Sequence, residues 1–244
     1  MKAMIFSAGM GTRLKPLTDN IPKALVPIAG VPMIERTIRT LIHAGCTEVV
    51  VNVHHFAEQI IEFIEANQSF GIKIHISDER GYLLDTGGGL KHAAEFLKGE
   101  EPILLYNVDI LSNVDLKKLY QQHLENNALA TLLVSNRKTS RYLLFEHGLL
   151  HGWQNIETGE VKSLYPNFDS KRYESLAFAG IHVVSPAIFD YMEEWTGKFS
   201  IIQFYLFVCA KAPVCAYKME NLHLLDIGKI DVIEKAEAFL KDCF

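Results

Sequence analysis

Short apolar runs alternate with segments whose apolar residues recur at helical spacing along the first half of the chain. The run Glu48–Val53 is nearly all apolar and β-branched, as strands buried on both faces are. In residues 33–44 the apolar positions recur every three or four residues, which indicates an amphipathic helix that Gly45 ends. We expect strands over residues 3–6, 48–53, 72–76, 102–106 and 128–135, and helices over residues 33–44, 56–66, 86–97 and 116–124. This β–α alternation predicts an α/β fold with a doubly wound, mostly parallel, Rossmann-like sheet.

The pattern changes after Arg137, where short apolar runs are separated by turn signals such as His147-Gly148. These runs, at 142–145, 149–154 and 161–164, predict a small β-rich insertion. Farther along we expect a strand over 175–185, a short helix from Pro186, an apolar helix over 200–211, strands over 214–217 and 223–225, and a final helix over 230–241. With 244 residues and no internal repeat, the chain is expected to form one domain over residues 1–244.

A loop of small residues follows the first expected strand, over residues 7–13. Gly9 and Gly11 let the backbone approach a ligand closely, and the N–H groups of such a loop suit phosphate. Arg13 adds a planar fork of donors that matches phosphate oxygens, and Lys15 and Lys23 add point charges. A strand that leads into a glycine loop and then into several cations predicts a site for a polyphosphate.

Two common phosphate-binding motifs do not match this loop. No Gly-Lys-Ser/Thr sequence ends it, so it is not a P-loop. Leu14 stands where the dinucleotide-binding fingerprint has its third glycine, and Asn52 rather than an acidic residue ends the second expected strand. Both features disfavour a Rossmann dehydrogenase.

The composition narrows the range of partners. The formal net charge of −5 argues against a protein that binds the phosphate backbone of DNA or RNA. No apolar run reaches the roughly 18 residues of a membrane-spanning helix, so no membrane association is expected. The four cysteines, at positions 46, 209, 215 and 243, form no CxxC pair and lie in or near apolar segments. This usage predicts reduced thiols and a cytoplasmic location.

Two further features lie near the ends of expected strands. Asp109 follows a strand that should be buried, and ligands of open α/β sheets bind at the carboxyl ends of the strands. The run Gly87-Gly88-Gly89 stands between a strand and a helix. Three glycines there would let a flat ring or a sugar lie against bare backbone, with N–H groups facing it.

The opening segment also carries a long string of fixed residue types. Residues 8–18 read A-G-x-G-T-R-L-x-P-L-T and residues 22–27 read P-K-A-L-V-P. Together they resemble the signature of the sugar-1-phosphate nucleotidyltransferases, the nucleotide-sugar pyrophosphorylases. Residues 84–89 resemble the family's L-x-T-G-G/A-G string, residues 107–109 its N-G-D string with valine in place of glycine, and residues 226–228 its D-x-G string.

The resemblance covers essentially the whole chain, at the length of a compact group that includes N-acetylmuramate-1-phosphate uridylyltransferases and small mannose-1-phosphate guanylyltransferases. It implies the fold of the nucleotide-diphospho-sugar transferases, with a nucleotide-binding half over residues 1–135 and a sugar-binding half over residues 136–244. It also implies an enzyme of EC 2.7.7 type in nucleotide-sugar biosynthesis for the cell envelope. Such an enzyme makes an NDP-sugar and pyrophosphate from an NTP and a sugar 1-phosphate, by in-line attack at the α-phosphate.

The resemblance further implies roles for individual residues. Arg13 would clamp the leaving β- and γ-phosphates, Lys23 would stabilise the α-phosphate and the incoming phosphate, and Asp109 and Asp226 would hold Mg²⁺. The residues implied to bind the nucleotide are Ala8, Gly9, Gly11, Thr12, Arg13, Thr86, Gly87 and Gly88, and those implied to bind the sugar are Asn107 and Gly180.

One element of the family pattern is missing. Many relatives carry E-K-P before the strand that contains the equivalent of Gly180, and the lysine holds the sugar phosphate. This chain has Leu164-Tyr165-Pro166 there, so the role must fall to another cation or be absent. The candidates are Lys162, Lys171, Arg172 and Arg141.

Several alternatives remain for the substrates. The opening Ser7-Ala8-Gly9 resembles the A-A-G of uridylyl- and thymidylyltransferases, which favours UTP. GTP with mannose or heptose 1-phosphate is one alternative, and CTP with a phosphoalcohol such as phosphocholine is another. A nucleotide-sugar sensor without activity is the non-enzyme alternative, and the presence of both metal carboxylates argues against it. We expect a monomer or a homodimer.

Overall fold

The structure is a computed structural model that describes residues 1–228 and 230–243. The main sheet consists of β1 (Lys2–Phe6), β4 (Glu48–Val53), β5 (Lys73–Asp78), β6 (Ile103–Asn107), β8 (Ala130–Ser135), β9 (Arg141–Glu146), β10 (Leu149–Asn155), β11 (Val161–Lys162), β12 (Glu174–Val184) and β13 (Val214–Lys218). Its order is β11-β10-β13-β8-β12-β6-β1-β4-β5, with β9 paired to β10 and β12. Two short pairs stand apart, β2 (Pro27–Ile28) with β3 (Val31–Pro32) and β7 (Ile110–Ser112) with β14 (Leu224–Asp226).

Helices cover both faces of this sheet. The α-helices are α1 (Met33–His43), α2 (Ala57–Ala66), α3 (Asp85–His92), α4 (Ala94–Leu97), α5 (Leu116–Asn126), α6 (Ile188–Tyr191), α7 (Ile201–Val208) and α8 (Ile233–Cys243). In β1, Ala3 and Ile5 pack into one core and Met4 and Phe6 into the other, because successive strand residues point to opposite faces. The first core includes side chains of α1, α2 and α5, and the second includes those of α3, α4, α6 and α7. The predicted α/β fold is confirmed.

The sheet is mixed, which corrects the prediction of a mostly parallel sheet. β1 pairs in parallel with β4 and β6, and β8 pairs in parallel with β13. β12 lies between β6 and β8 and is antiparallel to both. An apolar pattern identifies β12 as a strand, but it does not say which strands β12 will separate, since that depends on pairing between distant segments.

Some element boundaries also differ from the predictions. β6 ends at Asn107, so Asp109 lies in the turn that leads to the unpredicted strand β7. The helix expected over residues 86–97 is interrupted at Ala93, between α3 and α4. α7 covers Ile201–Val208 rather than residues 200–211, and its buried face confirms a core helix. Short 3₁₀ helices occur at η1 (Thr12–Leu14), η2 (Lys23–Leu25), η3 (Gln68–Gly71), η4 (Ser170–Arg172) and η5 (Ile230–Val232).

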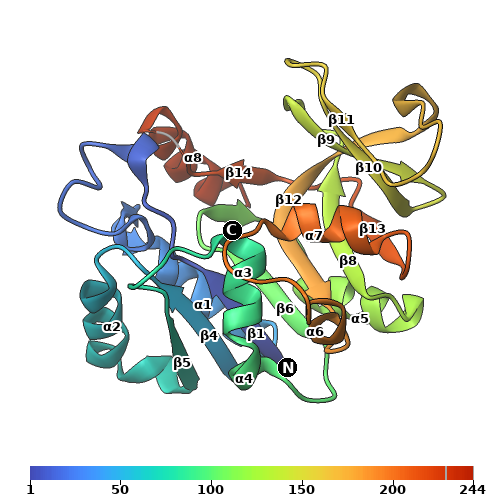
Figure 1. Ribbon diagram of the computed structural model, residues 1–244. Coiled ribbons are helices and arrows are strands. Elements are labelled where there is room, and N and C mark those ends of the chain that lie inside the picture. The colour runs from blue at the N-terminus through green and yellow to red at the C-terminus, as the bar shows by residue number, and fades with distance from the viewer. Residues whose placement is uncertain (229, 244) are drawn as a thin grey trace.

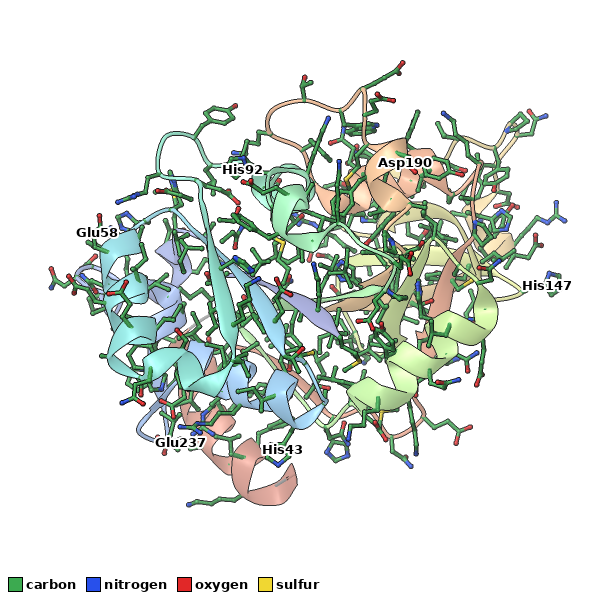
Figure 2. The ribbon with its side chains drawn as sticks, turned by 90° about the horizontal axis from the view of Figure 1, so that it is seen from below. His43, Glu58, His92, His147, Asp190 and Glu237 are labelled. Atoms are coloured by element: carbon green, nitrogen blue, oxygen red, sulfur yellow. The ribbon has the colours of Figure 1, made fainter. Side chains whose placement is uncertain are left out.

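The β-rich insertion forms one end of the molecule, where β9, β10 and β11 pair in antiparallel fashion. Figure 1 shows these strands above α7, with α2 and β5 on the opposite side. In Figure 2, His147 in the β9–β10 turn and Glu58 on α2 mark the two ends. Strands β1 and β6, with the loops that follow them, therefore lie between the insertion and α2.

The cysteines of the described chain are free thiols. Cys46 and Cys215 are buried and Cys209 is half-buried, and burial raises the pKa of the Cys46 thiol to about 11. The side chain of Cys243 lies outside the described part of the structure. Among the residues described, no helix combines the length and the apolar character that crossing a lipid bilayer requires.

Candidate active site

A cavity of about 350 Å³ lies over the carboxyl ends of the central strands. Its lining includes Ser7, Ala8, Gly9, Lys23, Asn52, Glu79, Thr86, Asn107, Asp109 and Lys198. A smaller cavity of about 160 Å³ shares Gly9 and Lys23 with it and adds Gly11, Thr12, Arg13 and Gly228. We call the two together the glycine-loop site. Its place at the strand ends is where open α/β sheets bind ligands.

Two polar side chains hold the beginning of the glycine loop. The N–H groups of Ser7 and Ala8 donate to Asn52 Oδ1 at 2.7 and 3.3 Å, and Asn52 Nδ2 donates to Glu79 Oε1 at 2.7 Å. Glu79 is only 3% exposed, and its Oε2 accepts from the Leu84 N–H at 3.1 Å. The chain from Asn52 to Glu79 thus fixes the loop after β1 relative to the start of α3. The sequence signals these residues only by their places at the ends of β4 and β5.

The rest of the loop presents free donors. The N–H groups of Gly9, Gly11 and Thr12 make no hydrogen bond within residues 1–228 and 230–243. Gly11 has a φ of +63°, and a Cβ there would lie 3.0 Å from Thr18 Cγ2 and 3.1 Å from Lys23 Cβ. This position therefore needs glycine, both for its left-handed backbone and for its close approach to Lys23. A row of unpaired N–H groups of this kind binds anions.

Charged side chains gather beside this loop. The Lys23 ammonium forms an ion pair with the Asp109 carboxylate, and these side chains are only 11% and 19% exposed. A Cβ on Gly228 would lie 2.8 Å both from Arg13 Nη2 and from Asp226 Oδ1, so these two side chains meet over Gly228. Lys15, by contrast, pairs with Asp19 at 3.3 Å and lines neither cavity of the site.

Backbone pairing brings Asp226 to Asp109. β14 is antiparallel to β7, with Asp226 opposite Ile110, and the Ile227 N–H donates to the Asp109 carbonyl at 2.8 Å. Loss of hydration raises the pKa of Asp226 above its ordinary value even though the residue is partly exposed, and the negative charge of Asp109 raises it further. Two carboxylates that repel one another form a site that a cation stabilises.

This pair fits Mg²⁺. Mg²⁺ binds through one or two carboxylates and completes its coordination with phosphate oxygens and water. In the described part of the chain, no cluster of three or more histidine, cysteine or acidic residues could hold a metal ion. The site therefore offers Asp109 and Asp226 as its two carboxylates and leaves the remaining positions to a ligand.

The glycine run at the start of α3 differs from the expectation. The N–H groups of Gly87 and Gly88 both donate to the Phe199 carbonyl, at 2.9 and 3.1 Å. A Cβ on Gly87 would lie 2.4 Å from the Phe199 ring, and one on Gly88 would lie 2.4 Å from the Gly197 carbonyl oxygen. The prediction that these N–H groups face a ligand is therefore wrong for Gly87 and Gly88. Glycine is needed there because the segment before α7 packs directly onto the helix.

Of the other predicted residues, Thr86 and Asn107 line the cavity, and Gly180 packs against Asn107. Thr86 lines the cavity, and its Oγ1 accepts from the Ile201 N–H at 3.0 Å, which ties α7 to α3. Asn107 also lines the cavity. Gly180 has a φ of +76°, and a Cβ there would lie 2.8 Å from Asn107 Nδ2. Gly180 thus makes room for the Asn107 side chain.

Two cations near the site were not selected by sequence reasoning: Lys198, which lines it, and Arg137, which lines neither cavity but acts electrostatically on Asp226. Lys198 lines the larger cavity from the loop before α7, and its ammonium has no hydrogen-bond or ion-pair partner among the described residues. Arg137 follows β8, its Nη2 donates to the Phe178 carbonyl at 3.0 Å, and its charge acts to lower the pKa of Asp226. Both come from segments distant in sequence, and no local pattern marks them.

The four cations proposed to replace the missing lysine do not line the glycine-loop site. Arg141 and Lys162 line a separate cavity, and Lys171 and Arg172 lie on η4, outside both.

Comparisons with known proteins identify the family of the chain. The family model described as nucleotidyl transferase matches residues 2–242. The N-acetylmuramate alpha-1-phosphate uridylyltransferase of Neisseria meningitidis is 39% identical and aligns over 98% of this chain and 97% of its own length. The enzyme of the same name from Caulobacter vibrioides is 31% identical over 98% of this chain and 97% of its own.

A solved structure shows the same fold. The UDP-glucose pyrophosphorylase from Acinetobacter baumanii superposes with a TM-score of 0.76 at 18% identity, covering 98% of this chain and 92% of that one. With a family model that spans nearly every residue and relatives of matching length, the chain belongs to the nucleotidyl transferase family, among its sugar-1-phosphate nucleotidyltransferases.

Proposed function

We propose that the protein transfers a nucleotidyl group from an NTP, with UTP favoured, to a sugar 1-phosphate and releases pyrophosphate. One observation carries this proposal. Free N–H groups, two cations and two carboxylates converge at one edge of the sheet, and a triphosphate that reacts at its α-phosphorus needs all three.

The glycine loop and Arg13 would hold the leaving group. The N–H groups of Gly9, Gly11 and Thr12 have no partner in the described chain, and the Arg13 guanidinium lies beside them. These donors would bind the β- and γ-phosphates, which leave together as pyrophosphate. Since the donors are already in place, charge that grows on the leaving oxygen is stabilised without rearrangement of the loop.

Lys23, Asp109 and Asp226 would act at the α-phosphate. The Lys23 ammonium lies between the two cavities and can stabilise the negative charge that builds on the α-phosphate oxygens. Asp109 and Asp226 would hold Mg²⁺, which when bound supplies further positive charge there. The Lys23–Asp109 ion pair keeps both groups in position and neutral as a pair when no triphosphate is bound.

Lys198 and Arg137 are the cations that we assign to the sugar phosphate. Lys198 lines the same cavity as Asp109, and Arg137 lies close enough to Asp226 to affect its pKa. An oxygen of the sugar phosphate attacks the α-phosphorus, and the bond from that phosphorus to the bridging oxygen breaks. The electron pair leaves with pyrophosphate. Such a step depends on alignment and on neutralised charge.

The nucleoside and the sugar would occupy the rest of the larger cavity. Thr86 and Glu79 line its wall beside α3, which we assign to the nucleoside, and Asn107, supported by Gly180, is assigned to the sugar. The preference for UTP rests on the resemblance of Ser7-Ala8-Gly9 to the opening of uridylyltransferases.

Pyrophosphate release tests the proposal. The protein is incubated with Mg²⁺, each NTP in turn, and one acceptor at a time, with EDTA as the control. The acceptors are the 1-phosphates of glucose, mannose, N-acetylglucosamine and N-acetylmuramate, and phosphocholine. We expect release with UTP and at least one sugar, and none with EDTA. Absence of release with every pair would contradict the proposal. Release only with CTP and phosphocholine would contradict the sugar assignment.

A further inference from the structure

A second cavity, of about 720 Å³, lies between the β-rich insertion and α7. We call it the tryptophan cavity. Its lining includes Arg141, Trp153, Lys162, Trp195, Ser200 and Gln203. Trp195 is held in place by ring contacts with Phe199, Phe204 and Phe207, at centroid distances of 4.9, 5.5 and 5.4 Å. Packing against these rings therefore fixes the position of the Trp195 side chain in the cavity wall.

The charge of this cavity is unbalanced. Its lining contains two cations and no acidic residue. Lys162 is occupied in part, because it pairs with Glu160 at 3.1 Å and its Nζ lies 5.1 Å from the centre of the Trp153 ring. The Arg141 guanidinium makes no hydrogen bond or ion pair within residues 1–228 and 230–243. A free guanidinium in a roomy aromatic cavity is a group that pairs well with an anionic ligand.

The segment before α7 contributes one residue to each of the tryptophan cavity and the glycine-loop site. Lys198 lines the glycine-loop site and Ser200 lines the tryptophan cavity, and residues two apart have Cα atoms within about 7 Å. The Ile201 N–H donates to Oγ1 of Thr86, which lines the glycine-loop site. A sugar that bridges the two cavities would place its 1-phosphate beside Lys198 and a ring substituent in the tryptophan cavity.

We propose that the tryptophan cavity binds a carboxylate carried on the sugar ring of the acceptor, with Arg141 as its partner. The inference rests on the proposed function and narrows its substrate to a sugar 1-phosphate with a second negative group. The planar Arg141 fork accepts a carboxylate through two parallel hydrogen bonds. Trp153 and Trp195 pack against the apolar parts of the substituent.

A matched pair of acceptors tests this assignment. N-acetylmuramate 1-phosphate and N-acetylglucosamine 1-phosphate differ only in the ether-linked lactate, which carries the carboxylate. We expect the protein to have the higher kcat/KM for N-acetylmuramate 1-phosphate, with Mg²⁺ and whichever NTP gives the fastest release. Arg141→Ala should lower the ratio of the two kcat/KM values about 10- to 100-fold, as for one lost charge-assisted hydrogen bond.

Two further variants show whether the effect belongs to this position. Arg172→Ala removes an exposed arginine of η4 that lines neither cavity, so the ratio should stay within about twofold of its original value. Arg141→Lys keeps the charge but loses the planar fork, so it should restore part of the preference.

Intrinsic fluorescence gives a readout that does not depend on turnover. The chain has two tryptophans, and both line the tryptophan cavity. N-acetylmuramate 1-phosphate should change their emission at lower concentration than N-acetylglucosamine 1-phosphate does, and Arg141→Ala should remove this difference.

The outcomes separate the two proposals. Equal kcat/KM values for the two sugars, or an Arg141→Ala variant with an unchanged ratio and an unchanged titration, would overturn the assignment of the tryptophan cavity. If no sugar releases pyrophosphate but the fluorescence response depends on Arg141, the proposed reaction is wrong and the carboxylate site stands.

Discussion

The glycine-loop site and the tryptophan cavity balance charge in opposite ways. In the glycine-loop site Lys23 is paired with Asp109, and Arg13 meets Asp226 over Gly228. In the tryptophan cavity Arg141 stands among aromatic and polar side chains with no acidic residue in the lining. The first region contains counter-charges for Lys23 and Arg13, which phosphates and a metal ion would replace, and only Lys198 at this site is unpaired among the described residues. The other has a positive charge that only a ligand can neutralise.

This difference suggests a division of work. A site that carries out phosphoryl chemistry must stabilise several charges in one arrangement, and paired cations and carboxylates keep that arrangement without ligand. A site that selects a substrate needs one well-placed partner for a group that competing substrates lack. Variants in the first region should therefore affect all sugars alike, and variants in the second should change the preference among them.

The largest effect should follow from removing the charges of the glycine-loop site. Lys23→Ala or Asp109→Ala should lower kcat about 10²- to 10³-fold with every sugar, as for loss of one group that stabilises transition-state charge. Circular dichroism should show an intact fold. Lys118→Ala, which removes an exposed lysine of α5, is the control and should retain its rate. Near-normal turnover in either site variant would refute the assignment.

A change in the segment between the two regions should cost stability. In Gly88→Ala the new methyl group would lie 2.4 Å from the Gly197 carbonyl oxygen and 3.1 Å from Leu84 Cβ. Overpacking of this kind lowers the free energy of unfolding by about 1–3 kcal/mol. Gly81→Ala is the control, since a Cβ there meets nothing within 4 Å. Urea denaturation that gives both variants the same unfolding free energy would contradict the packing described for α3.

Removal of Lys198 should have a smaller effect. Lys198→Ala should raise KM about 10-fold for every sugar 1-phosphate, because one charged hydrogen bond to the acceptor phosphate is lost. The preference between N-acetylmuramate and N-acetylglucosamine 1-phosphates should stay as it is. Steady-state kinetics at saturating NTP measure both values. A changed preference with an unchanged KM for N-acetylglucosamine 1-phosphate would place Lys198 in the tryptophan cavity instead.

The smallest effect concerns stability and pH at Asp226. Its folded pKa is raised above the ordinary 3.8, so the folded state binds the proton more tightly than the unfolded state. Stability should therefore fall as pH rises from about 4 through the raised pKa. Asp226→Asn removes this loss, so above that pKa the metal-free variant should be more stable by less than about 1 kcal/mol, since Asp226 is partly exposed.

Thermal unfolding in EDTA, measured from pH 4 to pH 8, tests this sign. The Tm of the variant should exceed that of the original protein by a margin that increases as pH rises. Mg²⁺ should raise the Tm of the original protein more than that of Asp226→Asn. A variant that is less stable at every pH would show that the Asp226 carboxylate stabilises the metal-free fold.

Local sequence patterns were sufficient to predict most of the helices and strands. The run Glu48–Val53 is a strand over the predicted residues, because burial on both faces requires a continuous apolar run. The place of β12 between β6 and β8 could not be predicted in this way. It depends on which distant strands pair, and the apolar alternation of a strand is the same for either direction and any neighbour.

The site was predictable where one segment carries several of its residues. Gly11 and Lys23 lie in the same opening segment, and their close contact follows from a left-handed backbone that glycine allows. Lys198 and Arg137 come from loops distant in sequence and were not predicted. The glycines at 87 and 88 were correctly predicted to allow another group to approach the backbone closely. That group is the Phe199 segment rather than a ligand.

The division of work between the two regions is tested most directly by one set of rates. Pyrophosphate release with N-acetylmuramate 1-phosphate and with N-acetylglucosamine 1-phosphate is measured for the original protein, Lys23→Ala and Arg141→Ala. We predict that Lys23→Ala slows both reactions by the same factor, and that Arg141→Ala slows the first reaction at least tenfold more than the second. Equal slowing of both reactions by Arg141→Ala, or rapid turnover of either sugar by Lys23→Ala, would contradict this division.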